Sequence, residues 1–133
     1  MNLPDRVSAI EARCNAIEEC YEFMLAYAAQ GLDTDSGSQS GTQIREFLRR
    51  SVTALTGIAE AINVGVIDAG AFRAVVERDA RDSLAAIELV LAQPAISSQL
   101  IDNLNASIHL RALLTDLFLL DEIVKLRGVG ASP

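Results

Sequence analysis

The residues best suited to chemistry lie on a polar line within a leucine-rich segment near the carboxyl end of the chain. His109, the one histidine in the sequence, lies there with Asp102, Asn105 and Asp116. At about 3.6 residues per turn these four positions fall on one side of a continuous helix. An oriented histidine can act as a general base, a metal ligand or a phosphoryl acceptor. The competing interpretation is a hydrogen-bonded histidine at an interface or at the boundary of the core.

The residue types and their spacing give little support for a metal site or for a nucleophilic catalytic residue. Asp102 and Asp116 are each two turns from His109, about 10 Å along a helix axis, which is too far for one coordination sphere. The sequence contains no Glu-x-x-His motif of di-iron bundles and no glycine elbow around a serine or cysteine. Cys14 and Cys20 point in different directions on one expected helix, so reduced buried thiols are expected, and a metal or redox pair would need a second subunit. We therefore predict no catalytic residues, no metal and no cofactor.

The six residues "HLRALL" resemble the phosphoryl-accepting segment of the histidine-phosphotransfer family. In that family a lone histidine on a bundle helix is followed by a leucine and a basic residue, which here are His109, Leu110 and Arg111. Ala112 stands where the family has a small glycine. The resemblance implies a phosphocarrier role for His109. We keep this role, together with the sensing of a small ligand between helices, as the alternative function.

Three arginines gather in a chain that is otherwise acidic. Arg45, Arg49 and Arg50 lie near the start of an expected helix, where the helix dipole also favours an anion. They form a candidate anion patch. The competing interpretation is a solvated face, because Glu46 is placed to pair with Arg50 at a spacing of four residues.

Apolar residues at steps of three and four predict long amphipathic helices, most clearly over residues 3–30. The stretch 31–41 is rich in Gly, Ser and Asp and is expected to be a flexible loop, and the tail 129–133 is expected to be frayed. One long and two short connections favour an all-α antiparallel four-helix bundle, a single domain over residues 1–128. The predicted helices cover residues 3–30, 42–63, 69–92 and 97–127.

The last predicted helix is apolar around nearly its whole circumference. In a four-helix bundle each helix normally keeps one face in water, so a helix of this kind needs a further cover. The same segment of a second copy is the expected cover, because most soluble oligomers are symmetric homodimers. The predicted dimer interface consists of Leu110, Leu113, Leu114, Leu117, Leu120 and Val124.

Two charged residues lie on apolar faces of the last two predicted helices. Asp79 lies near Phe72 and Val90, and Arg111 lies near Phe118. A hairpin whose turn centres near Pro94 would bring Asp79 and Arg111 to the same level. We predict a partly buried ion pair between them; the alternative is that both side chains reach water at the edge of the bundle.

Composition narrows the function further. The chain has 133 residues and a net charge of −7, which repels nucleic acids and anionic lipids, so neither is an expected partner. No apolar run reaches the roughly 18 residues of a membrane span, and no secretory signal is visible, so we expect a cytoplasmic protein. Together these features predict a non-enzymatic homodimer, a regulatory, adaptor or assembly protein that acts through contacts with itself and with a protein partner.

Overall fold

A computed structural model describes residues 3–62 and 70–126 of the chain. These ranges contain helices and no strand, which confirms the all-α prediction, but the helices number six and not four. None of the described helices is long and apolar enough to cross a bilayer. The elements are α1 (Leu3–Ala28), α2 (Gln39–Leu55), α3 (Ile58–Ile62), α4 (Phe72–Leu91), α5 (Ser98–Ala106) and α6 (His109–Leu126).

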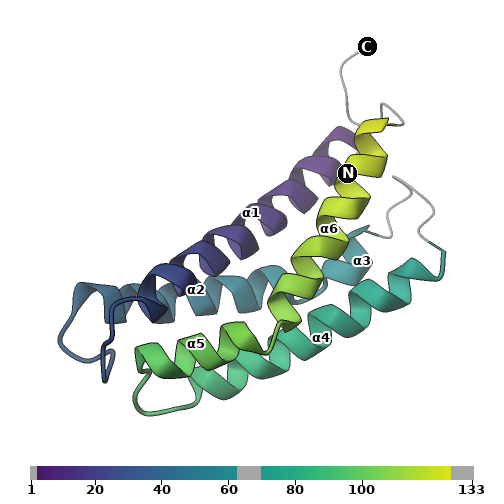
Figure 1. Cartoon of the computed structure of the whole chain (residues 1–133). Coiled ribbons are helices and arrows are strands. Elements are labelled where there is room, and N and C mark those ends of the chain that lie inside the picture. The colour runs from purple at the N-terminus through teal and green to yellow at the C-terminus, as the bar shows by residue number, and fades with distance from the viewer. Residues whose placement is uncertain (1–2, 63–69, 127–133) are drawn as a thin grey trace.

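The helices pack so that α1 and α6 have different principal neighbours. α1 packs mainly against α2 and α5, whereas α6 packs mainly against α4. α1 and α6 run in opposite directions, with the start of α1 and the end of α6 at the same end of the molecule (Figure 1). Large aliphatic and aromatic side chains from all of these helices fill one core. Its fully buried members include Ile17, Met24, Tyr27, Ile44, Leu48, Ile87, Ile101 and Leu113.

The second predicted helix is divided at Gly57. This residue has a φ of 80°, in the left-handed region where glycine carries no Cβ penalty. The backbone therefore turns between α2 and α3. α2 also begins earlier than the predicted residue 42, because the side chain of Ser38 caps it by accepting a hydrogen bond of 2.9 Å from the amide of Gly41.

The fourth predicted helix is divided at Ile108, between α5 and α6. Ile108 has a φ of 62° and is the one non-glycine residue with a positive φ in the described part of the chain. The amide of Ser107 donates to the carbonyl of Asn103, and that of Ile108 donates to the carbonyl of Asn105, which closes the end of α5. A β-branched residue in this backbone conformation is a genuine outlier.

The loop before α2 is fastened to the segment between α4 and α5. The Asp35 carboxylate accepts hydrogen bonds from Arg45 Nε at 2.5 Å and from the amide of Ile96 at 2.7 Å. Tyr27 Oη donates to the carbonyl of Ile96 at 2.6 Å. Residues 39–41 of the predicted loop belong to α2. The predicted tail 129–133 lies outside the described residues.

Candidate functional site

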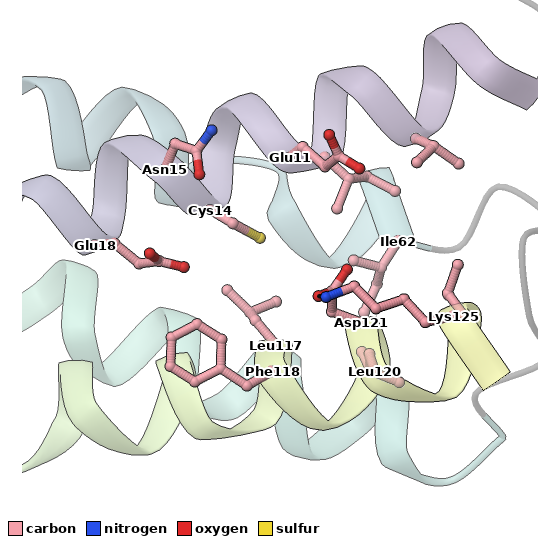
Figure 2. Close-up of a pocket in the computed structure, with 13 residues that line it drawn as sticks. Glu11, Cys14, Asn15, Glu18, Ile62, Leu117, Phe118, Leu120, Asp121 and Lys125 are labelled. Atoms are coloured by element: carbon pink, nitrogen blue, oxygen red, sulfur yellow. Dashed lines mark ion pairs between the residues drawn. The ribbon is translucent and has the colours of Figure 1, made fainter. Parts of the chain in front are cut away.

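A groove opens between α1 and α6, because each of these helices packs mainly against another neighbour (Figure 2). Its volume is about 290 Å³, and α3 contributes Ile62 to one end. Phe118 lies at its edge and is 51% exposed. The apolar lining comes from all three helices: Val7, Ile10, Ile62, Leu117, Phe118, Leu120 and Val124.

Acidic side chains surround this apolar lining. Glu11 and Glu18 of α1 and Asp121 of α6 lie around the groove (Figure 2). The one lysine in the lining, Lys125, lies with its Nζ 3.0 Å from Asp121 Oδ2, so its charge is already paired. Three carboxylates against one paired ammonium leave the groove with a negative potential.

The thiol in the groove responds to that potential. Burial raises the pKa of Cys14 to about 11, and the negative charges of Glu18, Asp121 and Glu11 add to this rise. Cys14 is therefore protonated at neutral pH and is a poor nucleophile. Burial likewise raises the pKa of Cys20, which lies in the core, to about 11. Both cysteines are free.

Three of the six large exposed apolar side chains in the described ranges, Phe118, Leu119 and Leu126, lie on α6, and Ile108 lies directly before its first residue. Ile108 is 58% exposed, Leu119 is 50% exposed and Leu126 is 77% exposed. Leu119 and Leu126 are seven residues apart and share one side of α6, away from the groove. We call Ile108, Leu119 and Leu126 the α6 ridge. The other large exposed apolar residues in the described ranges are Phe118 at the edge of the groove, Leu25 on α1 and Leu89 on α4.

The leucines of the predicted dimer interface are buried within one chain. Their apolar character therefore does not require a second copy, contrary to the prediction. α4 covers α6 on one side and α1 covers it on another, so these side chains need no second copy. Val124 is half-buried and lines the groove. The buried members of the predicted interface are Leu110, Leu113, Leu114, Leu117 and Leu120.

The predicted polar strip is not one line. The break at Ile108 puts Asp102 and Asn105 on α5, and His109 and Asp116 on α6. His109 is exposed as the first residue of α6. Asp102 is also exposed, whereas Asp116 is only 9% exposed. The four residues are therefore divided between two helices and between exposed and buried positions.

Asp116 faces Asp79 across the contact between α4 and α6. Burial raises the pKa of Asp116 to about 7, with further increases from a hydrogen bond to Asp79 and from its charge, and Arg78 opposes the rise. Asp116 Oδ2 is buried and finds no donor in the structure. A proton on Asp116 provides the missing hydrogen bond, because the resulting carboxyl group can donate to Asp79. The two aspartates therefore form a pair that is stable with one proton.

The predicted ion pair between Asp79 and Arg111 does not form in the structure. Arg111 is exposed, and the described ion pairs do not include it. The predicted register assumed one straight helix after Pro94, whereas the chain bends at Ile108 before it reaches α4 again. The level of Asp79 on α6 is therefore occupied by Asp116, five residues later.

The three arginines of the predicted anion patch have separate environments. Arg45 is largely buried and donates to Asp35 and to the carbonyls of Leu91, Gln93 and Pro94. Arg49 is exposed. The Arg50 guanidinium lies 4.4 Å from the ring centroid of Phe47 and 3.9 Å from Glu19, and not beside Glu46. The structure does not bring them together as one anion site.

Neither a metal-ligand cluster in the described residues nor a known relative identifies the chemistry of this site. Within residues 3–62 and 70–126, no group of three or more His, Cys, Asp or Glu side chains is placed to hold a metal ion. Comparison with protein-family models, curated proteins and solved structures finds no match to this chain.

Proposed function

We propose that this protein works without catalysis, as a regulatory, adaptor or assembly protein that acts through protein–protein contacts. The observation that carries this proposal is the presence of four exposed apolar side chains on α6 and at Ile108, the residue before it. Apolar side chains exposed singly are ordinary, but apolar residues grouped on one element are typical of interaction surfaces. The exposed members of this group are Ile108, Phe118, Leu119 and Leu126.

A second copy of the chain is the proposed occupant of the α6 ridge. In this proposal the fold acts as a four-helix bundle, in which α2 with α3 and α5 with α6 each serve as one bent helix. A two-fold contact between two α6 helices would remove both ridges from water at once. Free cysteines Cys14 and Cys20 are compatible with the reducing cytoplasm, where we propose that the protein acts.

The molecular mass in solution tests self-association. The mass of the native chain, 14.2 kDa for one copy, should approach twice this value by light scattering at several hundred micromolar, as for a weak dimer. The double variant Leu119→Gln/Leu126→Gln should give the mass of one chain, because polar side chains cannot replace the buried apolar area. Leu89→Gln is the matched control, since Leu89 is 67% exposed on α4, and its mass should stay that of the native protein. A native protein that remains monomeric would refute the homodimer.

The alternative role, a phosphocarrier, is supported by the exposure of His109. Its test is acid-labile phosphate on the protein after incubation with a small phosphodonor, with His109→Gln as the control. Incorporation that depends on His109 would replace the non-enzymatic proposal. The sensing of a small ligand has support in the groove, whose volume of about 290 Å³ is at the lower limit of typical ligand pockets.

A further inference from the structure

The groove between α1 and α6 has the length of a short helix. Its lining on α1 runs from Val7 to Glu18, which corresponds to about 16 Å at 1.5 Å per residue. It lies on the opposite side of α6 from Leu119, so it is a different surface from the α6 ridge. An elongated apolar groove between two helices is the geometry in which partner helices bind, with anchor side chains three, four and seven residues apart.

The apolar lining of the groove would contact the apolar side of such a helix. Ile10 from α1 and Val124 from α6 are among the apolar residues that line the groove. Leu117 from α6 and Ile62 from α3 add apolar surface, and Phe118 lies at the edge (Figure 2). Leu117 is already buried, whereas Phe118 is half-exposed. Two or three large apolar side chains of a partner would therefore gain most of their contact area at Phe118 and along α1.

The negative charges around the groove favour basic residues beside the apolar side of the partner helix. Glu11 and Glu18 are seven residues apart, so both point to the same side of α1, and Asp121 lies across from them on α6. The raised pKa of Cys14, to which all three carboxylates contribute, gives the same sign for the local potential. A second copy of this chain carries a net charge of −7 and would be repelled here. Lysine and arginine side chains would be attracted.

We propose that the α1–α6 groove binds an amphipathic helix of a partner protein, about three turns long, whose apolar side is flanked by lysine or arginine. This inference rests on the proposed role in protein–protein contacts and names the partner class for one surface. The apolar side lies on Ile10, Phe118 and Val124, and the basic residues lie beside Glu11 and Glu18, since Asp121 is already paired with Lys125. An adaptor would then bind itself through the α6 ridge and its partner through the groove.

Two designed peptides test the proposal on the full-length protein. Each is an amphipathic helix of about 16 residues, a little over four turns, with leucines spaced to form one stripe. One carries lysines beside the stripe and the other carries glutamates. By fluorescence anisotropy at low salt, the lysine peptide should bind at least about tenfold more tightly than the glutamate peptide. Raising the salt from about 50 mM to about 500 mM should weaken its binding, because exposed charges are screened.

Matched variants locate the binding. Glu11→Gln/Glu18→Gln should weaken binding of the lysine peptide about tenfold, the effect of removing two favourable charge contacts. Glu22→Gln/Glu46→Gln removes the same charge from exposed positions outside the groove and should change binding less than about twofold. Circular dichroism verifies that both variants are folded.

Three results would overturn the proposal. These are equal binding of the two peptides, equal effects of the two double variants, and binding of a long-chain alkylamine in the groove without binding of the lysine peptide. A native chain that forms dimers but binds neither peptide would remove the basic helix as partner and leave self-association intact. The failures of the two proposals are therefore distinguishable.

Discussion

Asp116 couples folding to pH in the direction opposite to that of most carboxylates. Its pKa is 3.8 in an unpartnered state and about 7 in the fold. Between these values the folded chain binds more protons than the unfolded chain, so the free energy of unfolding falls as pH rises. The contribution is fully present below about pH 4 and is lost above about pH 7, with a magnitude of about 4 kcal/mol at most. Asp35 acts in the usual direction, because its hydrogen bond from Arg45 lowers its pKa and its contribution is lost in acid.

Replacing Asp116 by asparagine tests this coupling. The amide stays neutral at every pH and can donate to Asp79, so Asp116→Asn should raise the free energy of unfolding at about pH 8 by about 2 kcal/mol. It should also flatten the fall in stability between about pH 5 and about pH 8. Asp82→Asn, at an exposed position of α4, is the control and should keep the native slope. Urea unfolding at several pH values measures both. An unchanged slope in Asp116→Asn would contradict the paired aspartates.

Arg45 and Arg49 lie one helical turn apart on α2, but they are expected to contribute very differently to the free energy of unfolding. Arg45→Ala leaves the buried Asp35 carboxylate without its cation and should lower the free energy of unfolding by about 3 kcal/mol or more. Arg49→Ala removes an exposed side chain and should change it by less than about 0.5 kcal/mol. Denaturant titration compares the two. Equal losses would contradict the structural role of the contact between Arg45 and Asp35.

At the scale of the helix, the break at Ile108 decides the packing of the last third of the chain. A left-handed residue at this position is normally glycine or asparagine. Ile108→Gly should therefore be more stable than Ile108→Ala by about 1 kcal/mol, since both remove the same side chain but only glycine is relaxed there. At Leu119, inside α6 and similarly exposed, the order should be reversed, because alanine is the better helix former.

Thermal unfolding of these four variants provides the comparison. If alanine were equal to or better than glycine at position 108, the backbone there would be helical. Residues 97–127 would then form the single helix that their apolar pattern predicts.

The periodic pattern predicted α1 and α4 to within three residues at each described end, because long amphipathic segments give a strong signal. The break at Gly57 had a visible signal, since glycine is the usual left-handed residue. The break at Ile108 had none, because isoleucine favours extended backbone and no glycine or proline stands nearby. The apolar period therefore predicts an unbroken helix through position 108, and the level predicted for Asp79 on this helix is wrong by five residues.

The groove could be predicted only in part. Glu11 and Glu18 appear in the sequence as the solvated side of an amphipathic helix. They become the edge of a groove only because α6 packs mainly against α4 and stands beside α1 without filling the space between them. Which helices become neighbours depends on the bends at Gly57 and Ile108. Only the bend at Gly57 has a recognisable signal in the sequence.

At the scale of the whole molecule, α6 contributes to the core, to the groove and to the ridge. This explains much of the apolar character of the segment, because α4 and α1 cover two of its sides and Phe118, Leu119 and Leu126 are exposed among polar residues on the rest of α6. The net charge of −7 opposes self-association, so dimers should form more readily where salt screens the repulsion. Binding of a basic helix should show the opposite dependence on salt.

The most direct test of α6 as an interaction surface is a dilution series of the isotopically labelled protein, followed by amide chemical shifts. The series runs from about 1 mM to about 10 µM, a range that covers the dissociation constants of weak dimers, at a salt concentration of about 0.3 M to screen the repulsion. We predict concentration-dependent shifts at Ile108, Leu119 and Leu126, with none at Leu89 of α4, which is also exposed. Shifts confined to another helix, or no shifts together with the relaxation of a monomer throughout, would contradict it.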